Sequence, residues 1–178
     1  MRRGVVLLFV LIMLTACGAS DSGLSTDDLA IIKVNDKKQV VRYGMSRATA
    51  EKVLGKSVND TSSFLRYENG VDILYRDDSV VLIRLDEESS GIYKTLQGAE
   101  VNMNKNDLKG IYGKDTVIET TEYNLDYIYD SIHQKYLTTM ELNPEKRDKF
   151  YHISLVFNDL GEAGSILLMD NKAAVLMN

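Results

Sequence analysis

The chain has 178 residues, 44% of them hydrophobic and 26% charged, with a formal net charge of −5. This balance allows a folded core and excludes a chain that is disordered by composition. The length suits one domain or two very small ones. The only cysteine is Cys17, so no internal disulfide can form.

The first sixteen residues have the organisation of an export signal. Arg2 and Arg3 precede an unbroken apolar run from Val5 to Leu14. A run of this length suits the core of a signal peptide and is too short to span a bilayer comfortably. We therefore predict that residues 1–16 direct export and are then removed.

The segment Leu14-Thr15-Ala16-Cys17 resembles a lipobox, the tetrapeptide read by the enzymes that process bacterial lipoproteins. The resemblance implies that Cys17 receives a diacylglycerol and becomes the mature N-terminus. Two acyl chains hold a protein firmly at a membrane, at about 0.8 kcal/mol per buried methylene. We expect a body anchored on the extracytoplasmic side of the cell membrane, with residues 17–29 as a flexible tether. The alternative is a signal peptide or core helix in which Cys17 is incidental.

Removal of the signal makes the protein more acidic. Without Arg2 and Arg3, 19 basic residues face 26 acidic ones, a net charge of about −7. An acidic domain without a basic stripe is a poor partner for nucleic acid or anionic lipid headgroups. We predict binding to neither.

A short helix is predicted between Ser46 and Gly55. Ser46 is a favourable N-cap, and Gly55 can adopt the left-handed conformation that ends a helix. Ala50, Val53 and Leu54 fall on one face of this helix, which we expect to pack against a sheet.

Strands follow this helix. The runs 64–67 and 71–75 are separated by Asn69-Gly70, a strong hairpin signal. A further turn leads into the apolar run 80–85. The sequence predicts a three-stranded antiparallel meander.

The same order recurs 58 residues later, with Asn102 in the place of Gly44. Asn104 is the expected cap, Gly113 the expected end, and Leu108, Ile111 and Tyr112 form the apolar face. Strands are predicted at 125–129, 153–157 and 166–169, so that Ile153, Leu155 and Phe157 correspond to Val71, Ile73 and Tyr75. Between the first two of these strands lies a charged loop at about 131–149, which is either a functional insertion or a longer solvated hairpin.

These patterns predict an α+β fold made of two tandem helix-plus-antiparallel-meander repeats, with the helices on one face of the sheet. The first repeat is placed at residues 30–90 and the second at 91–178. Helices this short persist only when buried, so Leu54→Asp or Ile111→Asp should unfold the domain.

The repeat resembles the β-lactamase-inhibitor-protein-like and SmpA/OmlA-like lipoprotein families. The resemblance is carried by Gly44-Met45-Ser46, by Leu54-Gly55-Lys56 and by the segment 70–75. It implies that the other face of the sheet is open as a concave surface for protein binding.

Catalytic and metal-binding groups are not evident. His133 and His152 lack partners at metal-ligand spacing, and each is predicted to be a hydrogen-bonded surface group. The acidic run Asp86-Glu87-Glu88 could supply paired carboxylates but is better explained as a solvated turn. We predict no cofactor, no metal and no enzymatic activity.

We predict a non-enzymatic protein-interaction module that is attached to the membrane by its N-terminal lipid and binds a protein of unknown identity. Ten tyrosines and no tryptophan fit either an interface or strand-rich structure. The candidate partner surface comprises Asp72, Leu74, Arg76, Leu82, Arg84, Tyr127 and Tyr129. The alternative is a lipoprotein that binds a small ligand or cell-wall fragment, which requires a pocket with convergent polar groups.

Overall fold

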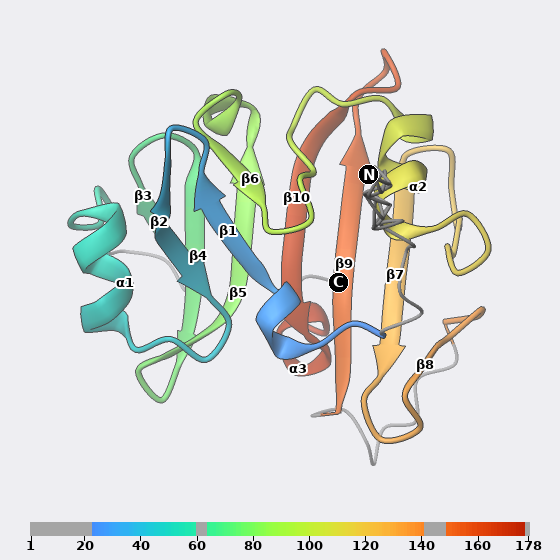
Figure 1. Cartoon of the computed structure of the whole chain (residues 1–178), viewed down its shortest axis with the longest axis horizontal. Coiled ribbons are helices and arrows are strands. Elements are labelled where there is room, and N and C mark those ends of the chain that lie inside the picture. The colour runs from blue at the N-terminus through green and yellow to red at the C-terminus, as the bar shows by residue number, and fades with distance from the viewer. Residues whose placement is uncertain (1–22, 60–63, 141–148, 177–178) are drawn as a thin grey trace, which may run out of the picture.

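Two antiparallel sheets form the body in the computed structural model, which describes residues 23–59, 64–140 and 149–176 (Figure 1). The large sheet has seven strands in the order β3-β4-β5-β10-β9-β7-β8, and the small sheet has three in the order β2-β1-β6. The strands of the large sheet are Phe64–Tyr67 (β3), Val71–Arg76 (β4), Ser79–Asp86 (β5), Asn124–Asp130 (β7), Lys135–Tyr136 (β8), Phe150–Phe157 (β9) and Ala163–Asp170 (β10). Those of the small sheet are Ala30–Lys33 (β1), Asp36–Arg42 (β2) and Tyr93–Thr95 (β6). The predicted signal peptide and Cys17 lie outside the described residues.

The helices are short. They are α1 (Arg47–Leu54), α2 (Lys105–Tyr112) and α3 (Asn171–Ala174), with 3-10 turns at Thr26–Asp28 (η1) and Glu87–Ser89 (η2). None of the helices in the described ranges is long and apolar enough to cross a bilayer.

The first two helices begin and end where the sequence predicts. Gly55 and Gly113 end them with positive φ angles of 84° and 104°. The Asn104 side chain accepts a hydrogen bond from the first turn, as expected of a cap. The Ser46 hydroxyl instead bonds to the Thr49 hydroxyl at 2.9 Å, so its expected bond to a backbone N–H is not formed.

The predicted α+β fold class is wrong. The protein is mostly β, with 44% of residues in strands and 18% helical. The main reason is the small sheet, which adds strands on the face where only helices were expected. Its pairing of Ile31 with Thr95 joins segments that are far apart in the sequence, so local patterns could not reveal it.

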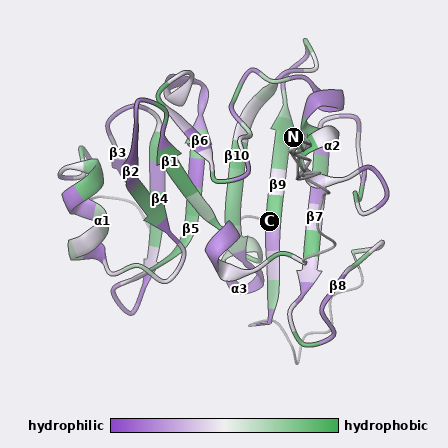
Figure 2. Ribbon diagram, in the orientation of Figure 1, coloured by the Kyte–Doolittle hydropathy of each residue, from purple (hydrophilic) through white to green (hydrophobic). Residues whose placement is uncertain are grey.

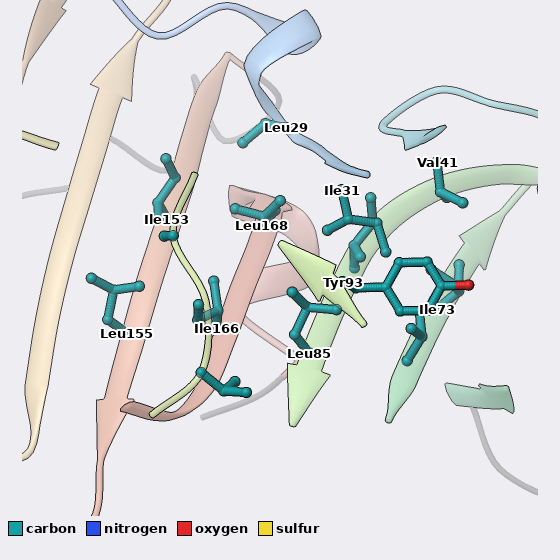
Figure 3. Close-up of a cluster of buried hydrophobic side chains, with 14 of the residues drawn as sticks. Leu29, Ile31, Val41, Ile73, Leu85, Tyr93, Ile153, Leu155, Ile166 and Leu168 are labelled. Atoms are coloured by element: carbon teal, nitrogen blue, oxygen red, sulfur yellow. The ribbon is translucent and has the colours of Figure 1, made fainter. Parts of the chain in front are cut away.

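The main core lies between the large sheet and a layer formed by the small sheet, α1 and α2. Side chains from β1, β2 and β6 point toward those of β4, β5, β9 and β10 in Figure 3. Hydrophobic residues are concentrated on the strands (Figure 2). We call the sheet face toward this core the inner face and the opposite one the outer face. Inner-face residues include Leu65, Tyr67, Val71, Ile73, Ile83, Leu85, Leu125, Tyr127, Ile153, Leu155, Ile166 and Leu168.

Two parts of the chain occupy corresponding places in the large sheet. The first unit is α1-β3-β4-β5 and the second unit is α2-β7-β9-β10, and their last strands, β5 and β10, pair at the centre. In the first unit, Gly44 N–H donates to Val80 C=O at 2.8 Å. In the second, Asn102 N–H donates to Ala163 C=O, also at 2.8 Å.

Gly44 and Asn102 share an uncommon backbone conformation. Their φ angles are 77° and 66°, in the left-handed region that favours glycine and, among other residues, asparagine. Glycine in the first unit and asparagine in the second therefore adopt the same local geometry.

The last residues of the predicted tether contact the body. Leu24 and Leu29 are buried in the main core. Between them, Ser25 N–H donates to the Asp28 carboxylate at 2.7 Å and holds the η1 turn. Gly23 lies against the ring of Tyr129, where a β-carbon would collide with that ring. From Gly23 onward, the chain is packed onto the folded domain.

Candidate functional site

Ion pairs occupy the outer face of the first unit. Asp72 is 3% exposed and accepts from Arg66 Nη1 at 3.1 Å and from Arg84 Nε at 2.8 Å. Arg66 also pairs with Asp86 and with Glu88. The buried carboxylate is thus matched by two guanidinium groups.

Helix α3 covers the apolar centre of the outer face. Its residues Ala173 and Ala174 pack in one cluster with side chains of three strands, Leu74, Val81, Leu82, Leu167 and Met169. Asp170 fixes the start of the helix, because its carboxylate accepts from Ala173 N–H at 2.7 Å and from Arg76 Nη1 at 2.8 Å. The Tyr43 hydroxyl donates to the same carboxylate at 2.9 Å.

A pocket of about 280 Å³ lies beside α3, on the outer face of the second unit. Strands β7, β9 and β10 form its floor, and α3 forms one wall. Its lining residues are Thr120, Asn124, Asp126, Met140, His152, Ser154, Val156, Leu167, Met169, Asn171, Ala174 and Val175. We call this cavity the outer-face pocket.

Two buried polar side chains in this pocket lack hydrogen-bond partners. Nε2 of His152 and both amide atoms of Asn171 form no hydrogen bond of normal geometry within the residues that the structure describes, although the Asn171 side chain lies close enough to His152 to affect its pKa. His152 is 4% exposed and Asn171 is 0% exposed. Leaving a buried polar group unsatisfied costs about 1–3 kcal/mol, and such groups are rare in native proteins. A polar molecule in the pocket would supply the missing partners.

Burial sets the charge state of the pocket. It lowers the pKa of His152 from its usual 6.5 to about 4, against a smaller side-chain hydrogen-bond effect of Asn171 and the negative charge of Asp170, which both raise it. His152 is therefore neutral at physiological pH, and Nε2 can accept or donate according to its tautomer. Burial also raises the pKa of Asp126, while a hydrogen bond from Ser154 lowers it by less. The pocket thus disfavours charge and fits an uncharged ligand.

The side chains of the pocket are not arranged as a catalytic triad. His152 and Ser154 lie two residues apart on the same face of β9, about 7 Å along the strand. Ser154 bonds to Asp126 rather than to a histidine base, whereas an activated serine needs a base within hydrogen-bond reach. Among the described residues, no group of three or more His, Cys, Asp or Glu could hold a metal ion. The arrangement is suited to binding.

Most of the predicted partner surface is buried. On the outer face, Asp72, Leu74 and Leu82 are buried, and only Arg76 and Arg84 are partly exposed. Tyr127 and Tyr129 lie in the main core, on the inner face. A protein partner could reach two of the seven predicted residues without rearrangement.

The tyrosines serve mainly in packing. Tyr112 lies against Tyr127 with ring centroids 5.3 Å apart, and Tyr129 lies edge-on to Tyr136 at 5.2 Å. The Tyr127 hydroxyl donates to Gly113 C=O at 3.0 Å, which connects the end of α2 to the sheet. Their number reflects the strand content.

The two histidines differ. His133 Nδ1 pairs with the Asp130 carboxylate at 2.6 Å and is half exposed, as predicted for a surface group. The prediction for His152 is wrong, because this residue is buried in the outer-face pocket. The alternation of β9 could have placed His152 and Ser154 opposite Ile153 and Leu155, but no local signal shows that α3 covers them.

A second cavity of about 540 Å³ lies at the edge of the inner layer, between the end of α2 and the β7–β8 hairpin. Its lining includes Gly23 and Leu24 together with Tyr112, Tyr129, Lys135 and Tyr136. We call this cavity the N-terminal cavity, because the described chain begins in its wall.

No protein-family model, curated protein or solved structure matches the chain. The resemblance to the inhibitor-like and SmpA/OmlA-like lipoproteins stays a prediction from the sequence.

Proposed function

We propose that the protein is a lipoprotein, anchored through Cys17 on the extracytoplasmic side of the membrane, that binds a small uncharged ligand in the outer-face pocket. The unpartnered His152 and Asn171 side chains carry this proposal. They would bind a hydroxyl or amide of the ligand, while Leu167, Met169 and Ala174 would contact its apolar part.

The shape of the outer face favours this function over a protein interface. An interface requires accessible side chains, whereas Asp72, Leu74 and Leu82 of the predicted partner surface are buried, and α3 packs over the apolar centre of this face. The pocket instead combines apolar walls with a few convergent polar groups, as small-molecule sites do. Its volume of about 280 Å³ limits the ligand to the size of one sugar or one N-acylated amino acid.

Binding can be tested with two uncharged probes of this size, N-acetylglucosamine and N-acetylalaninamide. Saturation-transfer NMR should detect at least one probe on the wild-type protein. Asn171→Leu should abolish the signal, because leucine removes the amide and occupies its space. This variant should fold, since it replaces an unsatisfied buried amide with an apolar group of similar size.

Tyr136→Phe is the matched control, because Tyr136 lines the N-terminal cavity only. It should keep the probe signal. Absence of signal from both probes, or a signal that survives Asn171→Leu, would contradict the proposed pocket.

Lipid attachment has its own test. Cys17→Ala should lose the mass of the diacylglyceryl group and move from the detergent phase to the aqueous phase in cell extracts. A variant with the mass, cleavage and partitioning of the wild type would contradict the anchor.

A further inference from the structure

The chain leaves the folded domain at a defined place. Gly23 is fixed against Tyr129 near the end of β7, and Leu24 is buried directly after it (Figure 1). Gln97 Nε2 donates to Asp28 C=O at 3.2 Å and ties the next turn to the segment after β6. The point where the body meets any preceding chain is therefore the rim of the N-terminal cavity.

The distance from this point to the anchor is short. Cys17 precedes Gly23 by six residues, which span at most about 20 Å even when fully extended. A folded domain of this size has a radius of gyration of about 15 Å and is therefore roughly 40 Å across. The tether reaches only about half the diameter of the domain. The side of the domain opposite Gly23 therefore cannot face the membrane.

We propose that the end of the molecule formed by the N-terminal cavity and the β7–β8 hairpin faces the lipid surface, with Ile132 in contact with it. This inference rests on the proposed lipid anchor at Cys17. The partner of this surface is the bilayer in which the lipid anchor of the same chain is inserted.

The surface at this end suits contact with lipid headgroups. Ile132 lies in the turn of the hairpin and is 50% exposed, which is unusual for a large apolar side chain. Lys114 and Lys135 on the cavity wall are balanced by Asp28 and Asp115. The wall of the N-terminal cavity therefore carries no net formal charge, unlike the acidic mature chain, and repels anionic lipid less than the rest of the surface does.

Strand β7 provides a matched pair of positions for the test. Ile132 lies two residues after its last residue, Asp130, and Tyr123 directly precedes its first, Asn124. Tyr123 is 44% exposed, close to the value for Ile132. A strand of seven residues separates the two sites by about 20 Å or more.

The experiment uses the full lipidated chain in vesicles of phosphatidylethanolamine and phosphatidylglycerol. Ile132→Cys and Tyr123→Cys are each labelled with a bimane fluorophore, since Cys17 is blocked by lipid. Quenching by a lipid with a spin-labelled headgroup should be at least threefold stronger at position 132 than at position 123. Equal quenching, or stronger quenching at 123, would overturn the orientation.

A longer tether gives an independent check. Insertion of twenty Gly/Ser residues after Ser22 leaves the packed segment intact and frees the body to rotate. The difference in quenching between the two positions should then fall to less than half. A difference that is unchanged would show that the tether does not set the orientation, and would contradict this account.

Flotation of the vesicles is measured on the same samples and separates the two proposals. Protein that does not float has no lipid anchor, which overturns the inference together with its premise. Protein that floats but shows no preference for position 132 retains the anchor and overturns only the orientation.

Discussion

The outer faces of the two units have the same backbone frame but different chemistry. In the first unit, Arg66, Asp72 and Arg84 lie side by side on β3, β4 and β5. Asp126, Ser154 and Leu167 hold the corresponding positions on β7, β9 and β10 of the second unit. A satisfied ion-pair network in one unit is thus replaced in the other by a carboxyl, a hydroxyl and an apolar side chain.

This difference explains why the pocket lies in the second unit. Long arginine side chains fill the surface of the first unit and neutralise its buried carboxylate. The shorter side chains of the second unit leave space, and His152 and Asn171 remain without partners at its edge. The same backbone arrangement therefore carries a surface of paired charges in the first unit and the outer-face pocket in the second unit.

The largest expected difference between the two units is in pH dependence. The folded protein binds a proton at His152 only near pH 4, whereas the unfolded chain does so near pH 6.5. Acidification between these values favours the unfolded chain, and the stability that is present above pH 6.5 is lost as pH falls to 4. The loss is about 3 kcal/mol.

Urea denaturation at pH 7 and pH 4 should show this loss in the wild type and a loss smaller by about 3 kcal/mol in His152→Gln. Asp126 titrates on the same face in the opposite direction, so the comparison between the two proteins isolates the histidine. An equal loss in both would contradict the burial of an unprotonated imidazole.

Asp72→Asn should lower the free energy of unfolding by about 2 kcal/mol at pH 7, because it leaves two arginines without their shared carboxylate. The partial exposure of both arginines keeps the loss below that of a fully buried pair. Ser154→Ala, at the corresponding position, should cost less than about 1 kcal/mol. If Asp72→Asn and Ser154→Ala lowered the free energy of unfolding by similar amounts in urea denaturation, the two outer faces would not differ in their contribution to stability.

The shared frame predicts equal effects at Gly44 and Asn102. Both have left-handed φ angles, so Gly44→Ala and Asn102→Ala should each cost about 1 kcal/mol. Asn102→Gly should be close to neutral in the same thermal denaturation measurements. A loss of stability in only one of the two alanine variants would show that the two units differ in backbone conformation at these positions.

Asp126→Asn should have the smallest effect, a modest gain in stability at pH 7. Burial raises the pKa of Asp126, so its contribution to stability is present at low pH and is lost as pH rises through the raised pKa. The side-chain amide of the variant cannot ionise, so the variant keeps the stability that the wild type loses as pH rises. The difference in stability between the variant and the wild type should therefore shrink toward pH 4. A variant that is less stable than the wild type at pH 7 would show that the ionised carboxylate has a favourable partner.

Local signals allowed part of the fold to be predicted. The ends of α1 and α2 depend on single capping residues and glycines, and the Asn69-Gly70 turn between β3 and β4 has positive φ angles at both positions. These features are determined within a few neighbouring residues.

The small sheet and the pocket could not be predicted in this way. The small sheet depends on pairing between β1 and β6, which are separated in the sequence by the whole first unit. The pocket depends on α3, a helix of four residues that Asp170 positions through Arg76 and Tyr43. Each of these contacts joins distant segments, so the sequence around His152 looks like an ordinary strand.

The outer-face pocket of the second unit should hold a ligand in the native protein. A high-resolution crystal structure of the lipidated protein, extracted from its own membrane without denaturation, tests it most directly. We expect density for an organic molecule within hydrogen-bond distance of His152 Nε2 and the Asn171 amide. A pocket that contains only ordered water, with those atoms bonded to it, would contradict the account.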